Sequence, residues 1–118
     1  MRFLFTIYHD ERVLDALPRD EMQALVDSAL DYSDELRRSG HYIASDALQR
    51  PRTARTIRVR DAKVSTSDGP FAETKEQLGV FFLIEAKDMD EACKIAARFP
   101  PARVGTIEVR PVRELEHS

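Results

Sequence analysis

The chain begins with a short stretch in which every second residue is large and apolar. Phe3, Phe5 and Ile7 fall on one face, and the residues between them fall on the other. This period of two predicts a β-strand over residues 3–8. The next four residues, 9–12, are polar, and we expect them to form a loop after the strand.

A helical pattern follows between residues 18 and 40. Pro18 suits the first helical position, and Gly40 suits the left-handed residue that often follows a helix. Residues at helical spacing between them form one mostly apolar stripe: Met22, Leu25, Val26, Ala29, Ser33 and Leu36. The spacing therefore predicts a long amphipathic helix with one face on the core.

The second half of the chain repeats strand and helix signals. Strands are expected over residues 42–48, 56–60 and 63–66, and the last two form a hairpin turning at residues 61–62. Residues 80–84 are the most apolar run and predict a central strand. Asp88 can cap a second helix, which Pro100 and Pro101 end. Pro111 indicates that the last strand ends there or lies at an edge.

This order, β-α-β-(β-β)-β-α-β, defines an α+β class. Without the hairpin it is the split βαβ pattern of a ferredoxin-like sandwich, an antiparallel sheet with two helices on one face. Apolar residues point to both sides of the predicted sheet. The face without helices therefore needs a cover, and a two-fold homodimer is the simplest closed solution.

Composition narrows the possible functions. The 118 residues correspond to one domain, 1–118, and a net charge of −3 gives no basis for binding nucleic acid. Cys93 is the single cysteine, and three scattered histidines lack metal-ligand spacing, so neither a metal nor a cofactor is expected. No apolar run is long enough for a membrane span or a signal peptide, and we expect a cytoplasmic protein.

One segment carries a literal motif. Residues 68–79, Asp-Gly-Pro-Phe-Ala-Glu-Thr-Lys-Glu-Gln-Leu-Gly, resemble the signature of the DGPF group within the YCII-related family. Residues 105–112 look like the last strand of that group, and residues 18–40 are similar to its first helix. The resemblance implies a dimeric α+β barrel and no general activity. Members of the group often look like companions of extracytoplasmic-function sigma factors, which implies a regulatory alternative.

The resemblance to the wider family includes one departure. That family is suspected of using a histidine in the first helix with an aspartate near the end of the second. These residues would fall near Ala29 and Phe99 here, and neither position carries the required group. A histidine–aspartate pair is therefore not carried over to this chain, and any catalysis needs other residues.

Candidate acid or base groups lie elsewhere. Asp68 either stabilises its own turn or stands at the mouth of a cleft as a base. His9, after Tyr8 at the end of the first strand, is either an exposed loop histidine or an acid or base near neutral pH. Glu73 and Lys75 belong either to a solvated short helical turn or to a charged loop that closes over a polar ligand.

Two further side chains complete the candidate cleft. Phe71 is expected to plug the turn after Asp68 into the core. Arg110, on the outward face of the last strand, either clamps a carboxylate or pairs with an acidic neighbour. The arginines between residues 50 and 60 favour a solvated hairpin face, with a docking edge as the second interpretation.

Two hypotheses of function remain from the sequence. The first is a domain that binds a small polar metabolite. As a cofactor-free enzyme it would transfer a proton to or from the metabolite, or isomerise the metabolite. The second is a non-catalytic regulatory protein that acts by contact with a partner. A cavity with converging polar side chains favours the first hypothesis, and a filled cleft with an exposed apolar or arginine-rich patch favours the second.

Overall fold

The computed structural model describes residues 1–117. In chain order the elements are β1 (Arg2–His9), α1 (Glu11–Asp15), α2 (Arg19–Arg38), β2 (Tyr42–Ala47), η1 (Pro51–Thr53), β3 (Arg55–Arg60), β4 (Lys63–Asp68), β5 (Gln77–Glu85), α3 (Met89–Ala97), η2 (Pro100–Val104) and β6 (Gly105–Pro111). The two η elements are short 3₁₀ turns that begin with proline.

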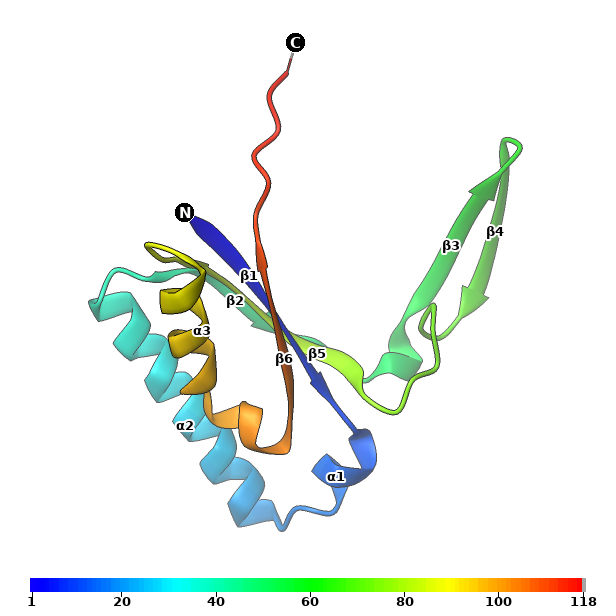
Figure 1. Ribbon diagram of the computed structural model, residues 1–118. Coiled ribbons are helices and arrows are strands. Elements are labelled where there is room, and N and C mark those ends of the chain that lie inside the picture. The colour runs from blue at the N-terminus through cyan, green and yellow to red at the C-terminus, as the bar shows by residue number, and fades with distance from the viewer. Residues whose placement is uncertain (118) are drawn as a thin grey trace.

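Four strands form the main sheet in the order β2-β5-β1-β6, and all neighbouring strands are antiparallel. This is the strand order of a ferredoxin-like sandwich, so the predicted fold class is confirmed. The most apolar strand, β5, is central, and β6 is an edge strand that ends at Pro111, as its sequence indicates. Helices α2 and α3 lie on the same side of this sheet (Figure 1).

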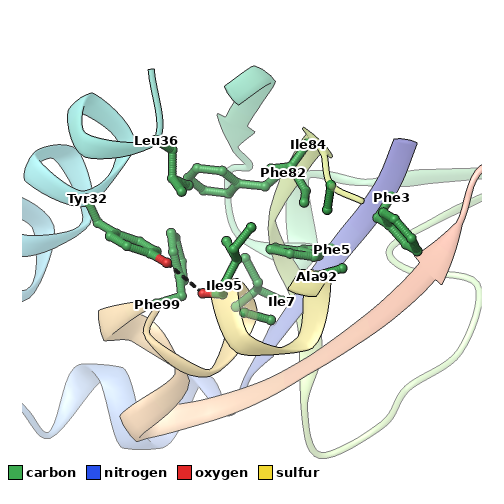
Figure 2. Packing of buried hydrophobic residues seen from close by; sticks show 12 residues of the cluster. Phe3, Phe5, Ile7, Tyr32, Leu36, Phe82, Ile84, Ala92, Ile95 and Phe99 are labelled. Carbon is green, nitrogen blue, oxygen red and sulfur yellow. Dashed lines mark hydrogen bonds between the residues drawn. The ribbon is translucent and has the colours of Figure 1, made fainter. Parts of the chain in front are cut away.

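The core fills the space between the sheet and these two helices. Phe3, Phe5 and Ile7 of β1 are fully buried, as their alternation predicts. Figure 2 shows Tyr32 of α2 reaching toward α3, where its hydroxyl donates a hydrogen bond of 2.8 Å to the carbonyl of Ile95. The two helices are therefore joined by a buried polar contact as well as by apolar packing.

Helix termini follow most of the predicted capping signals, although Pro18 precedes α2 as its N-cap and is not its first helical residue. The Asp88 side chain accepts a 2.9 Å hydrogen bond from the Glu91 backbone, and the Glu91 carboxylate accepts one from the Lys87 backbone. Gly40 follows α2 with φ of 81°, a conformation that a residue with a side chain rarely adopts. These contacts fix where α3 begins and where the chain leaves α2 for β2.

The hairpin of β3 and β4 forms a separate two-stranded sheet and does not join the main one. It projects away from the rest of the chain (Figure 1). Its turn is at Asp61 and Ala62, both with positive φ, as a tight hairpin turn requires. Its apolar side chains are exposed: Ile57, Val59 and Val64.

The prediction of a polar loop over residues 9–12 is wrong. His9 is the last residue of β1, and Glu11 begins the short helix α1. Asp10 caps this helix by accepting a 3.0 Å hydrogen bond from the Arg12 backbone. Because Asp10 satisfies the helix end, the chain turns immediately after the strand, and His9 stays buried instead of entering solvent.

Candidate functional site

A cavity of about 520 Å³ lies on the helix-covered side of the sheet. It is bounded by α2, by β2 and the segment that follows it, and by the ends of β1 and β5. Its walls are largely apolar and include Leu25, Ala29, Leu48, Val80 and Phe99. A volume of this size matches the usual range for small-molecule sites.

His9 enters this cavity because the alternation of β1 continues past Ile7. Every second residue of β1 points toward the helices, and His9 is the next residue in this series after Ile7. Only 8% of His9 is exposed. A polar ring therefore occupies a position where the pattern would otherwise place an apolar residue.

Two glycines on the flanking strands make room for the His9 ring. A Cβ at Gly79 would lie 3.2 Å from His9 Nδ1, and a Cβ at Gly105 would lie 2.7 Å from His9 Cδ2 and 2.2 Å from the Tyr8 carbonyl oxygen. Gly79 is also the extra residue of a β-bulge, since Ile7 pairs with Val80 while Tyr8 pairs with Leu78. Glycine within a strand often marks such close approaches.

The Nε2 side of the His9 ring is enclosed by protein. Among the described residues, Nε2 of His9 is buried and has no hydrogen-bond partner. Burial lowers the pKa of His9 below its ordinary value of 6.5, while the Pro101 backbone and the Glu76 carboxylate act in the opposite direction. Because burial has the largest effect, the neutral imidazole is the favoured form at neutral pH.

The neighbouring Asp10 has a different role. Its carboxylate accepts a hydrogen bond from the Arg12 backbone and lies 3.4 Å from the Arg12 guanidinium. These contacts hold the pKa of Asp10 below its ordinary value. The Asp10 carboxylate is therefore occupied by the cap of α1 and by the ion pair with Arg12. Of the two neighbours His9 and Asp10, only His9 remains free for chemistry in the cavity.

A second charged group lines the cavity close to His9 in the chain. Glu11 Oε1 is buried without a hydrogen bond, and it lies 4.0 Å from Nη1 of Arg50. The same guanidinium makes a shorter contact of 2.7 Å with Asp15 Oδ1. Arg50 thus bridges two carboxylates and ties the segment after β2 to α1.

The structure separates the residues that the sequence grouped as a candidate cleft. Tyr8 lies on the opposite face of β1 from His9. Asp68 ends β4, where its side chain is 89% exposed and 3.5 Å from Arg55. Phe71 is 75% exposed, so the prediction that it packs into the core is wrong for this chain by itself. Arg110 is exposed and pairs with Glu108 at 2.6 Å.

Glu73 and Lys75 border a smaller hollow of about 280 Å³ beside the main cavity. The predicted helical turn over these residues is wrong, because the loop has no helix. The Gln77 side-chain amide organises the loop by donating to the carbonyls of Ala72 and Thr74 at 2.8 and 3.1 Å. Gln77 also lines the main cavity, so the loop and the cavity share one wall residue.

Several cavity residues were missed from the sequence. The two glycines beside His9 had a readable signal, since glycine inside a strand indicates a bulge or a close approach. Glu11 and Arg50 had no such sequence signal, because the contact between them depends on how α1 packs against η1. Ala29 and Phe99, where the wider family's suspected pair would fall, both line the same cavity as His9.

Residues 1–117 also bear on metal and membrane sites. No group of three or more histidine, cysteine, aspartate or glutamate side chains there is arranged to hold a metal ion. No helix in this part of the chain has the length and apolar character needed to cross a membrane.

The fold and cavity define an α+β protein of the ferredoxin-like type with a cavity between sheet and helices. The YCII-related domain matches residues 1–116, and the chain belongs to this family. It is 32% identical over 114 residues to the uncharacterized protein R00369 of Rhizobium meliloti (strain 1021), covering 95% of this chain and 92% of that protein.

A solved structure shares the fold. This is 5-chloro-2-hydroxyhydroquinone dehydrochlorinase (TftG) of Burkholderia phenoliruptrix AC1100 in complex with 2,5-dihydroxybenzoquinone. The TM-score is 0.56, with 96% of this chain and 94% of that chain covered, and the sequence identity is 16%. At this identity the likeness shows the α+β barrel fold alone.

Proposed function

We propose that this protein binds a small molecule in the cavity beside His9, and that His9 acts there as a general acid or base. The observation that carries this proposal is that His9, a titratable residue only 8% exposed, lines a largely apolar cavity of about 520 Å³. An apolar cavity with a titratable side chain of perturbed pKa is typical of small-molecule and catalytic sites.

The protonation state of His9 supports this role. A histidine whose pKa is lowered by burial is neutral at neutral pH, and a neutral imidazole can take a proton from a bound ligand. The reaction class that follows is proton transfer or isomerisation without a cofactor. Of the acid/base groups expected from the sequence, Asp68 lies outside this cavity and Glu73 lies beside it.

A thermal-shift screen of small metabolites tests this function. We expect ligands that stabilise the wild type to stabilise Asp68→Asn equally, because Asp68 lies outside the cavity. The same ligands should lose most of their effect on Ala29→Phe, which fills the cavity, and any turnover should be lost in His9→Gln. The proposal fails if the ligands stabilise Ala29→Phe as well as the wild type, or if a broad library gives no ligand.

We also propose a homodimer, because the sheet face without helices carries large apolar side chains. Leu4 pairs with Leu83 and Thr6 with Phe81, so these residues share that face. Within residues 1–117 of a single copy, both long helices lie on the other side of the sheet (Figure 1). Light scattering should give twice the 13.5 kDa of one chain. A concentration-independent mass of 13.5 kDa would exclude the dimer.

The projecting hairpin favours a second candidate function, a non-catalytic protein that contacts a regulatory partner. Ile57 and Val64, exposed by 63% and 67%, share one face of the hairpin. Phe71 is 75% exposed in the loop that follows the hairpin, and its ring centre lies 5.5 Å from the guanidinium of Arg58, which belongs to the other face. Exposed apolar side chains of this kind are typical of interaction surfaces. An extracytoplasmic-function sigma factor is the partner that the DGPF resemblance suggests. Loss of partner binding in Phe71→Ser, with ligand binding intact, would support this alternative.

A further inference from the structure

The β3–β4 hairpin, residues 55–68, is an arm with two unlike faces. In the register of its strands, Ile57, Val59 and Val64 point to one side, and the side chains that point to the other side are polar or basic. Each of the three apolar side chains is more than half exposed in a single chain. Because a two-stranded hairpin by itself is only marginally stable in water, the arm needs a surface that covers its apolar face.

The motif that ends the arm fixes its base. Gly69 has a φ of 95°, and its N–H donates a 2.8 Å hydrogen bond to the Ala54 carbonyl. The Gly69 carbonyl accepts a 3.0 Å hydrogen bond from the Thr56 hydroxyl. Asp68, the residue before it, lies 3.5 Å from Arg55. The Asp-Gly-Pro-Phe segment thus closes the arm at the point where it joins the rest of the chain.

The arm and the bare face of the main sheet border the same space. The main sheet lies between the two long helices and the arm (Figure 1). Leu4, Phe81 and Leu83 are on the bare face, since they alternate with the buried Phe82 and Ile84 or pair across from residues that do. A second copy that covers this face therefore also meets the arm.

Charge also favours a second copy as the partner of the arm. The arm has four basic and two acidic side chains, a net charge of +2, in a chain whose net charge is −3. The rest of the chain therefore carries −5, and it attracts the arm of another copy. Arg58, Arg60 and Lys63 lie on the polar face of the arm, so they stay in solvent when the apolar face is covered.

The area that a stable dimer needs points the same way. The four strands of the main sheet average about 7.5 residues, so the bare face measures about 25 by 19 Å, or about 480 Å². Two such faces bury about 950 Å², less than the about 1,200 Å² at which specific interfaces begin. Each arm, with two strands of six residues, adds about 200 Å². Two arms bring the interface to about 1,350 Å², which lies inside the range of specific interfaces.

Resting on the proposed homodimer, we propose that each arm crosses to the other copy and packs its apolar face on the bare sheet face of that copy. Ile57, Val59 and Val64 then meet the surface that contains Leu4 and Leu83. The Asp-Gly-Pro-Phe segment serves as the base of a dimerisation arm. The polar face of the arm stays outside this contact.

Two substitutions at neighbouring residues test the arm. Val64→Asp places a carboxylate on the apolar face, and the matched control Ser65→Asp places it on the polar face; both residues are exposed in a single chain. Sedimentation equilibrium of the whole chain gives the dissociation constant of the dimer. We expect Val64→Asp to raise it by about 30-fold or more, because a carboxylate is buried in each of two symmetric contacts. Ser65→Asp should change it by less than about threefold.

A disulfide test reports the contact directly, in chains that also carry Cys93→Ser. Under oxidation, chains with Val59→Cys mixed with chains with Leu83→Cys should form a mixed disulfide dimer, and chains with Ser65→Cys in place of Val59→Cys should not. The arm contact is overturned if Val64→Asp leaves the dissociation constant unchanged or if no mixed disulfide forms. The homodimer then stands, and the apolar face is free for a regulatory partner. A wild type of 13.5 kDa at every concentration overturns the homodimer and the arm together.

Discussion

The placement of Gly105 against His9 leads to a quantitative prediction. Gly105 has extended backbone angles that any residue adopts, so the effect of Gly105→Ala is purely steric. The added Cβ would stand 2.2 Å from the Tyr8 carbonyl oxygen, which must retreat by about 1.2 Å to reach an ordinary contact of 3.4 Å. That oxygen belongs to the backbone of the paired strand β1, and it cannot move without shifting the strand.

Inserting a methyl group into a well-packed site costs about 1–3 kcal/mol. We expect Gly105→Ala to lie at the top of this range, about 3 kcal/mol, because backbone has to move. The melting temperature should fall by about 10 °C. Urea unfolding followed by circular dichroism measures the free energy, with the slope checked for two-state behaviour.

Gly79→Ala is the internal comparison. Its Cβ would meet only a side-chain atom, His9 Nδ1, at 3.2 Å. A small rotation of the ring relieves that contact, so the expected loss is below about 1 kcal/mol. If Gly105→Ala proves as mild as Gly79→Ala, His9 is not enclosed between these strands, and the explanation of its burial is wrong.

Three other measurements test the structure. Because the pKa of His9 is lowered in the folded chain, the unfolded chain binds a proton more readily near that pH, and the free energy of unfolding should fall as the pH drops below 6.5. In His9→Gln this loss of stability should shrink. An unchanged pH profile in that variant would contradict the burial of the ring. Tyr32→Phe should lower the free energy of urea unfolding by about 1 kcal/mol, because the hydrogen bond from the Tyr32 hydroxyl to the Ile95 carbonyl is lost. The Ile95 carbonyl keeps the Arg98 backbone N–H as a donor, so the loss should be no larger. No measurable loss would show that the hydroxyl bond is not formed in solution. Asp88→Ala should cost about 1 kcal/mol through the lost cap of α3, with Asp88→Asn close to the wild type; equal losses in both would indicate that charge and not capping is at work.

The fold was predictable because local signals and global topology agree. The alternation of β1, the apolar stripe of α2 and the cap at Asp88 each indicate an element that the structure contains. Their order then leaves few ways to build an antiparallel sheet with helices on one side. The separation of the β3–β4 hairpin was not predictable, since its two strands satisfy each other whether or not they join the main sheet.

The site was predictable only in part. The motif around Asp68 is literal and easy to recognise, yet it ends in an exposed loop. His9 was among the candidates, but its burial depends on α1, whose five residues carry too weak a helical pattern to read. The approach of Arg50 to Glu11 and Asp15 joins residues 35 or more positions apart. Such contacts result from packing and leave no periodic signal.

The strand order also affects how the chain is made. β1 pairs with β5 and β6, which begin at residues 77 and 105, so β1 has no sheet partner until these later segments are made. At about 5–20 residues per second, the interval between the end of β1 and the end of β5 lasts roughly 4 to 15 s. During that interval residues 3–8, an uncharged apolar segment, have no sheet neighbour. Nascent β1 is thus a segment exposed to aggregation and to capture by chaperones on the ribosome.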